Sequence, residues 1–490
     1  MRSHLFPLLP PLLRHVNVRQ ALGLLLLAGV AGLTARAQAP VAIGSRLELF
    51  VDRHLIETME RVDFRLHAPT KAPRAKSPLP ERHMVTVIKD GDRYRAWYRG
   101  KDPSYTGETH TGNAGETVHY AESRDGIEWE FPNLGLHEVG GTRDNNAILA
   151  KWPPYLTNFM PFLDSREGVP PGERYKALAG YPGTGDKRGL DKPGHGLFAF
   201  VSPDGIHWTQ RDEAIRYRPQ WRHAFDSPNV AFWSEAEQCY VCYFRTWTEP
   251  GRLRSVSRST SADFVTWSDP VDMNPNLPGE HLYTTQTHPY LRAPHVYLAF
   301  PTRFVPGRGN APEADRKDVN ATDILFMSTR AGSTTYDRLF TEACIRPGLD
   351  PARWGNRANY AALNLIPTGP DELSLYHRSG DRYTFRLDGF ISVHAGSVEG
   401  ELVTKPIVFS GGELVLNFST GAAGAIRVEL QTPGGEPLRG FSLADSEVAY
   451  GDSTERVLRW KGGSPSTVAG QPVRLRFVLK ECDLYSYRFR

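Results

Sequence analysis

The sequence predicts an all-β protein, a five-bladed β-propeller followed by a C-terminal antiparallel β-sandwich. The first observation is a turn motif, Ser-x-Asp-Gly-x-x-Trp, found at 123–129 and 202–208 and in altered form at 261–267. The second is that a short strand-like run precedes each copy. The third is a high content of glycine and proline, 45 and 38 residues, without any long helical period. Regular repetition of a strand and turn unit is typical of a propeller.

The motif itself predicts a hairpin turn. Its copies begin at 123, 202 and 261, with a degraded fourth copy at 328, so the spacings are 79, 59 and 67 residues. The aspartate caps its own turn, and the glycine supplies a positive φ. The tryptophan then opens the next strand. Because the aspartate recurs in equivalent turns, we assign it to the fold and not to catalysis.

The chain divides into four parts on this interpretation. Residues 38–80 contain N-terminal strands and a connector, and residues 81–388 form the propeller, with repeats that open near 81, 158, 226, 283 and 359. Residues 389–490 have alternating apolar strands about ten residues apart, separated by Gly/Pro turns. Such a pattern is typical of an antiparallel sandwich.

Residues 1–37 are predicted to be a signal peptide. An apolar run, 21–33, follows Arg14 and Arg19, and Ala35 and Ala37 form a small-x-small cleavage site. We therefore expect a periplasmic or secreted protein without stable membrane insertion after cleavage. A retained N-terminal anchor is the alternative.

The sequence argues against nucleic acid binding and against a metal site or other cofactor. The net charge is +3, and no basic block indicates nucleic acid binding. Three histidines, His281, His288 and His295, lack a carboxylate at ligand spacing, so no metal site or other cofactor is expected, although a structural calcium ion stays open. The four cysteines are expected to be buried free thiols, with one disulfide as the alternative.

Catalysis is expected where the five inner strands begin, because these ends converge at one mouth of the central channel. Glycoside hydrolysis requires two carboxyl groups, one to donate a proton and one to attack or to activate water. Asp226 is the first candidate, since no packing reason explains an acid there. Glu81 and Glu280 are the other two candidates.

Substrate binding is assigned to polar and aromatic side chains at or near the same mouth. Aromatic faces stack on sugar rings, and arginine pairs with carboxylate or sulfate. The expected ligand is thus an oligo- or polysaccharide, with an anionic glycan as one option. The predicted binding residues are His83, Asn158, Asn229, His281, Tyr283, Arg292, Arg303, Arg357, Asn359 and Tyr360.

These features together resemble secreted five-bladed propeller glycoside hydrolases, and more narrowly glycoside hydrolase family 32, the fructosidase-like group. The resemblance rests on the export signal, Leu49-Phe-Val-Asp52, the repeated turns and the sandwich after residue 390. It implies a glycosidase that hydrolyses O-glycosyl bonds. Phe225-Asp-Ser-Pro228 echoes the family's Arg-Asp-Pro and implies a stabiliser role for Asp226, with Glu280-His281 near the family's acid.

The family's first-blade motif, Trp-x-Asn-Asp-Pro-Asn-Gly, is replaced here by Glu81-Arg-His83, and its Glu-Cys acid motif is absent. The catalytic motifs are therefore degenerate, and two other functions stay open. One is a non-catalytic carbohydrate-binding propeller. The other is a sialidase-like six-bladed propeller, for which Arg292, Arg303 and Arg357 would form the arginine triad.

Overall fold

The computed structural model describes residues 39–107, 114–151, 156–180, 196–218, 224–248, 251–308 and 320–490. The predicted signal peptide, 1–37, lies outside these ranges. Within them the regular structure is almost entirely β, with only short 3₁₀ turns such as η1 (Pro171–Glu173), η3 (Pro351–Arg353) and η4 (Pro465–Val468). The predicted all-β class is therefore confirmed. A search of these same residues finds no helix of the length and apolarity that a bilayer crossing requires.

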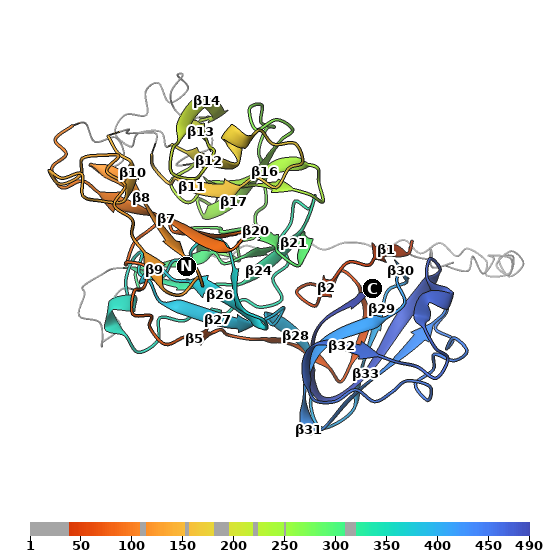
Figure 1. The fold of residues 1–490 in the computed structure, drawn as a ribbon. Helices are drawn as coiled ribbons and strands as arrows, with labels where there is room; N and C mark the ends of the chain where they lie inside the picture. The colour runs from red at the N-terminus through yellow and green to blue at the C-terminus, as the bar shows by residue number, and fades with distance from the viewer. Residues whose placement is uncertain are drawn as a thin grey trace, which may run out of the picture. The chain divides into compact units, whose positions relative to one another are not determined.

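Five antiparallel sheets form the blades (Figure 1). Blade 1 contains β6 (Thr86–Asp90), β7 (Arg93–Lys101), β8 (Glu116–Ser123), β9 (Trp129–Glu130) and β10 (Ala147–Leu149). Blade 2 contains β11 (Met160–Leu163), β12 (Tyr175–Ala179), β13 (Gly196–Ser202) and β14 (Thr209–Arg216). Blade 3 contains β15 (Val230–Ser234), β16 (Cys239–Trp247), β17 (Arg254–Ser261) and β18 (Val271–Asp272).

The last two blades are less regular. Blade 4 contains β20 (His288–Tyr290), β21 (Ala293–Ala299) and β24 (Met327–Arg330), and a second small sheet of β19 (His281–Leu282), β22 (Thr302–Pro306) and β23 (Asn320–Ile324) extends it. Blade 5 contains β25 (Ile366–Gly369), β26 (Glu372–Tyr376), β27 (Arg382–Arg386) and β5 (Thr70–Lys71). The N-terminal β5 pairs with β27, so the fifth blade is completed by a strand from the start of the chain (Figure 1).

The turn motif holds neighbouring blades together. In its second copy the Asp204 carboxylate accepts hydrogen bonds from the amides of Ile206 and His207, both at 2.8 Å. The Gly205 carbonyl accepts a 2.7 Å hydrogen bond from the indole of Trp97 in blade 1. Gly205 has φ +79°, and a Cβ there would meet the Trp97 ring at 2.7 Å. The glycine is thus required both by the turn and by the contact between blades.

Tyrosine hydroxyls also link adjacent blades. The Tyr240 hydroxyl donates to Asp164, and the Tyr297 hydroxyl donates to Glu237, each at 2.7 Å. The Tyr94 hydroxyl donates at 2.5 Å to the Pro367 carbonyl and so links blade 1 to blade 5. Such buried, satisfied hydrogen bonds fix the positions of adjacent blades.

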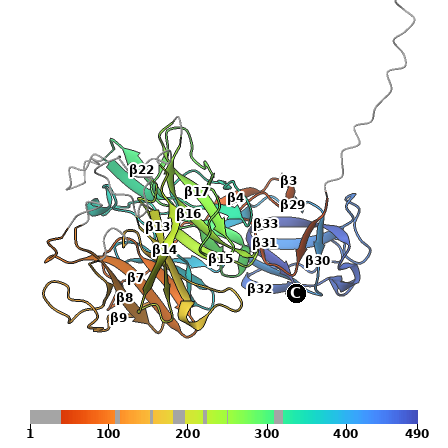
Figure 2. The same cartoon turned by 90° about the horizontal axis from the view of Figure 1, so that it is seen from above.

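The remaining strands form one sheet with two long strands, β31 (Leu414–Gln431) and β33 (Pro472–Phe489) (Figure 2). Its C-terminal members also include β28 (Ile391–Ala395), β29 (Gly400–Thr404), β30 (Ile407–Phe409) and β32 (Asp452–Leu458). Four N-terminal strands pair into the same sheet: β1 (Val41–Gly44), β2 (Glu48–Leu49), β3 (Ile56–Glu60) and β4 (Asp63–Leu66). An apolar core lies beneath these strands.

A buried ionic cluster joins the N-terminal strands to blade 4. Arg330 donates to Asp52 at 2.7 Å and to Glu48 at 3.0 Å. Although burial acts to raise the pKa of Glu48, His295 and Arg330 hold it lower, at about 2. Asp52, which ends the Leu-Phe-Val-Asp segment, is thereby part of the scaffold.

All four cysteines are free, and three of them, Cys242, Cys344 and Cys482, are buried. Burial raises the pKa of Cys344 and Cys482 to about 12, so these thiols are inert at neutral pH.

Candidate functional site

The first strand of a blade is its inner strand, and in four of the five blades a residue with left-handed backbone conformation precedes it. Met84, Asn158, Gln286 and Asn364 have positive φ, and each lies two positions before the first residue of an inner strand. Non-glycine residues in this region are uncommon and are favoured at functional sites. Met84 packs against Tyr283 and Tyr360, and Asn158 donates to the carbonyl before Asp226; we call the region around these residues the funnel.

Asp226 and Arg245 form the centre of the funnel. The Arg245 Nη2 donates to the Asp226 carboxylate at 2.6 Å. The Asp226 side chain is 48% exposed, whereas Arg245, on β16, is 3% exposed. The Arg245 Nε and Nη1 atoms are buried and have no hydrogen-bond acceptor in the described part of the chain. A half-exposed carboxylate is therefore held by a buried cation with spare donors.

Aromatic rings surround a second arginine beside this pair. The Arg254 guanidinium lies 4.7 Å from the Trp247 ring centre, 5.3 Å from that of Tyr283 and 4.5 Å from that of Phe304. Arg245 also lies over Tyr283, at 5.0 Å. Burial and the nearby charge of Arg245 lower the pKa of Arg254 from its ordinary value. Cation–π contacts replace an acidic partner at Arg254.

Tyr283, Tyr360 and His83 continue the wall of the funnel. The ring centres of Tyr283 and Tyr360 are 5.6 Å apart, and those of Tyr360 and His83 are 5.4 Å apart. Arg357 lies close to Tyr283 and Tyr360, whose hydroxyls raise its pKa. Burial and nearby arginines, Arg378 first among them, lower the pKa of His83 to about 3. His83 is consequently neutral at physiological pH.

A hydrogen-bonded network supports the funnel from blades 1 and 2. Asn158 donates at 2.8 Å to the carbonyl of Phe225, directly before Asp226, and accepts from Arg99 at 2.8 Å. Arg99 also pairs with Glu116 at 2.6 Å. Burial raises the pKa of Glu116. Glu116 was outside the sequence prediction because it opens the third strand of its blade, not the first.

Glu81 lies at the rim of the funnel. Its side chain is 63% exposed and accepts a 2.6 Å ion pair from Arg378, which is 15% exposed. Arg378 also contacts the backbone carbonyl of Arg357 at 3.1 Å, so the rim is connected to the tyrosine wall.

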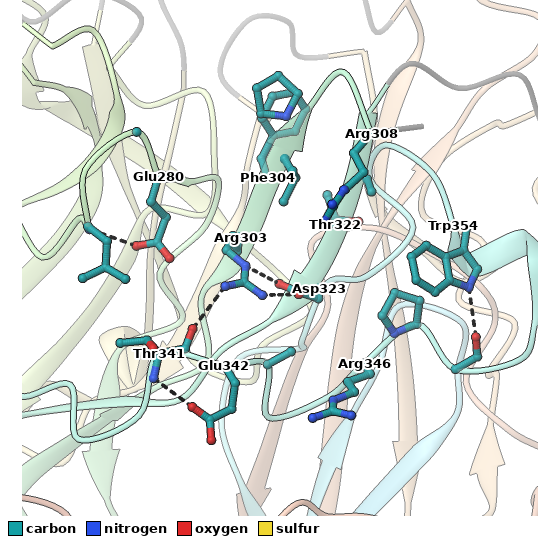
Figure 3. A pocket seen from close by; sticks show the side chains of 18 of the residues that line it. Glu280, Arg303, Phe304, Arg308, Thr322, Asp323, Thr341, Glu342, Arg346 and Trp354 are labelled. Carbon is teal, nitrogen blue, oxygen red and sulfur yellow. Dashed lines mark hydrogen bonds and ion pairs between the residues drawn. The ribbon is translucent and has the colours of Figure 1, made fainter. Parts of the chain in front are cut away.

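Glu280 and Arg303 lie in a cleft of about 800 Å³ on the extension of blade 4 (Figure 3). The Glu280 carboxylate is 6% exposed and pairs with Arg338 at 2.5 Å. Arg303 makes a two-point ion pair with Asp323, with the Nε–Oδ1 distance at 3.0 Å. Asp226 pairs with Arg245 and Glu280 pairs with Arg338, and no hydrogen bond or ion pair joins the two acids in the described part of the chain.

The other predicted binding residues have structural partners. Asn359 is buried and bonds to Thr322 and Arg353. Arg292 pairs with Asp388, which precedes β28, and with Glu455 of β32. In the funnel itself, Asn229 donates at 3.3 Å to the Phe225 carbonyl, and the His281 ring accepts at 3.1 Å from the Arg254 amide.

Arg292, Arg303 and Arg357 are thus not a triad, because Arg292 and Arg303 pair elsewhere. Arg245, Arg254 and Arg357 are the arginines that surround Tyr283. Within the described residues there is no group of three or more His, Cys, Asp or Glu side chains arranged to bind a metal ion.

No family model matches the chain, and no curated protein is similar to it. Solved structures with a similar arrangement of strands include a glycoside hydrolase family 43 arabinoxylan arabinofuranohydrolase from Bacillus subtilis (13% identity, 84% of this chain and 96% of that chain, TM-score 0.40). A family 32 β-fructofuranosidase from Bombyx mori is 12% identical over 87% of this chain and 94% of its own, with a TM-score of 0.38. An N-acetylgalactosamine deacetylase from F. plautii is 12% identical over 84% and 95%, with a TM-score of 0.39. Likeness of this size concerns the fold alone.

Proposed function

We propose that the protein is an exported glycoside hydrolase whose funnel binds a glycan, with Asp226 as its central carboxylate. The observation that carries this proposal is the environment of Asp226. Its carboxylate is half-exposed at the end of the channel, a buried arginine fixes it at 2.6 Å, and aromatic rings line the adjacent wall. A fixed, half-exposed carboxylate beside aromatic side chains suits recognition and cleavage of a sugar.

A second carboxyl group is needed for hydrolysis, and blade 1 offers two. Glu81 is exposed at the rim and is available to a bound glycan. Glu116 is buried behind Arg99, and its raised pKa favours the protonated form that a proton donor needs. We assign Glu81 as the second carboxyl group of the site, because its side chain is open to the solvent and that of Glu116 is not. Glu280 is left out because Arg338 occupies its buried carboxylate.

A carbohydrate-binding protein without catalysis is the second candidate. Asp226 and Glu81 both have arginine partners, and such ion pairs also suit carboxylates that shape a binding site. In that case the funnel binds a glycan and releases it unchanged.

The test is a glycan panel applied to the purified full chain, with products detected by chromatography and binding by calorimetry. We expect turnover of at least one glycan, and a loss of about 100-fold or more in Asp226→Asn and Glu81→Gln. Glu116→Gln tests the competing donor, and Asp269→Asn, at an exposed ion pair, is the control. Binding without any product supports the non-catalytic function, and full activity of Asp226→Asn contradicts the assignment.

A further inference from the structure

The funnel has more positive than negative charge around Tyr283. Three arginines surround this ring, namely Arg245, Arg254 and Arg357. Asp226 is the carboxylate whose charge acts on all three. Asp226 pairs directly with Arg245. Neither Arg254 nor Arg357 has an ion-pair partner among the described residues.

Two largely buried arginines elsewhere in the propeller each have a carboxylate partner, and their Nε atoms lack an acceptor among the described residues. Arg258 pairs with Glu237, and Arg338 pairs with Glu280. Arg353 has neutral acceptors instead, the side-chain oxygens of Asn359 and Tyr383. Arg254 differs from all of these, because its guanidinium packs on aromatic rings and has no ion-pair partner among the described residues.

Several donors in the funnel are therefore unused. The Nε and Nη1 atoms of Arg245 and the Nε atom of Arg254 are buried without an acceptor in the described part of the chain. A buried donor without an acceptor is costly, and Arg245 differs from Arg258 and Arg338 in that its Nη1 atom lacks an acceptor as well. The planar guanidinium group matches the oxygens of a carboxylate or a sulfate.

We propose that the glycan bound in the funnel carries an anionic group, a carboxylate or a sulfate, and that Arg254 and Arg357 bind it beside Arg245. This inference rests on the proposed function, since it names the class of glycan that the same site takes. A uronic acid and a sulfated sugar present the same chemistry to these arginines.

The test compares charged probes with their neutral partners on the purified full chain. One arm uses oligogalacturonides and their methyl esters, and the other uses sulfated galactan oligosaccharides and their desulfated forms. We expect one charged probe to bind about tenfold or more tightly than its neutral partner, which corresponds to about 1.4 kcal/mol. This preference should weaken as the salt concentration rises. The arm in which this preference appears shows whether the anionic group is a carboxylate or a sulfate.

Variants then locate the anion. Arg254→Gln and Arg357→Gln should each remove most of the preference for the charged probe over its neutral partner. Arg254→Lys, which keeps the charge but not the planar group, should retain part of the preference. Arg346→Gln, an exposed arginine of the neighbouring cleft, is the matched control and should have no effect. Because the comparison of probes needs only the wild-type chain, it does not depend on the folding of a variant.

The inference is wrong if no charged probe binds more tightly than its neutral partner, or if Arg254→Gln and Arg357→Gln leave the preference intact. Turnover of a neutral glycan that depends on Asp226, without preference for charge, would overturn this inference and leave the proposed function standing. Preference for a charged probe without turnover would support the inference and contradict the hydrolase.

Discussion

The Asp226 carboxylate accepts a 2.6 Å hydrogen bond from Arg245, and the two side chains differ sharply in exposure, 48% against 3%. The acid faces the funnel, while the cation that holds it is inside blade 3. On folding, the Arg245 guanidinium loses its hydrogen bonds to water, and the hydrogen bond to Asp226 replaces only part of them. The carboxylate is consequently important both to the site and to the stability of the blade.

Removing Asp226 should therefore destabilise the protein. We expect Asp226→Ala to lower the free energy of unfolding by about 2 kcal/mol, because the buried guanidinium loses a charged partner. Asp226→Asn should cost less, since the amide oxygen still accepts the hydrogen bond. Urea denaturation measures both values.

Asp269→Ala is the control for this prediction. Asp269 pairs with Arg218 at the surface, where its side chain is 78% exposed, so its removal should change stability by less than about 1 kcal/mol. Equal costs for Asp226→Ala and Asp269→Ala would mean that the buried position of Arg245 has no energetic consequence.

Glu280 should behave as a structural residue. Its carboxylate is 6% exposed, and Arg338 pairs with it from a side chain that is 8% exposed. We expect Glu280→Gln and Arg338→Met each to lower the melting temperature, and the turnover of folded enzyme to stay within about threefold of wild type. Loss of turnover in Glu280→Gln at unchanged stability would instead make Glu280 catalytic.

Much of the fold was predictable because it repeats. The turn motif marks the same hairpin in three blades, and its aspartates make the same backbone hydrogen bonds at Asp125, Asp204 and Asp263. Local sequence patterns do not show which distant strands pair. Neither the pairing of β5 with β27 nor that of β1–β4 with the C-terminal strands has a local signal, since each joins segments more than 300 residues apart.

The site was predictable to the extent that it lies at the openings of inner strands. His83, Asn158, Asp226 and Tyr360 do meet in the funnel, because closure of the ring brings those openings together. Arg254 was missed, since it opens the third strand of its blade and no pattern marks that position. Glu280 and Arg303 were expected at the funnel, but an additional sheet, β19–β22–β23, places them in a separate cleft.

The turn motif allows a prediction about stability alone. Asp204 accepts backbone hydrogen bonds from Ile206 and His207 and lies outside the funnel. Asp204→Ala leaves these amides without an acceptor and should lower the free energy of unfolding by about 1–2 kcal/mol, with unchanged glycan binding. Asp212→Ala, an exposed aspartate of β14, should be neutral, and equal effects of the two changes would contradict the proposed role of the turn.

His288 should make the protein less stable in acid. Its side chain is buried in the channel, its Nδ1 contacts the Gln286 carbonyl at 2.9 Å, and burial lowers its pKa to about 4. Between the ordinary pKa, near 6.5, and 4, the unfolded chain binds a proton at this position and the folded chain does not. Stability therefore falls as the pH falls through this range, by up to about 1.4 kcal/mol per pH unit and about 3 kcal/mol in all.

The measurement is the free energy of unfolding as a function of pH, for wild type and His288→Gln. We expect the two curves to converge as the pH falls from 6.5 towards 4, because the glutamine does not take up a proton in the unfolded chain. His83 and His377, whose pKa values burial also lowers, keep some acid sensitivity in the variant. Parallel curves for wild type and His288→Gln would show that His288 takes up its proton equally in the folded and unfolded chain.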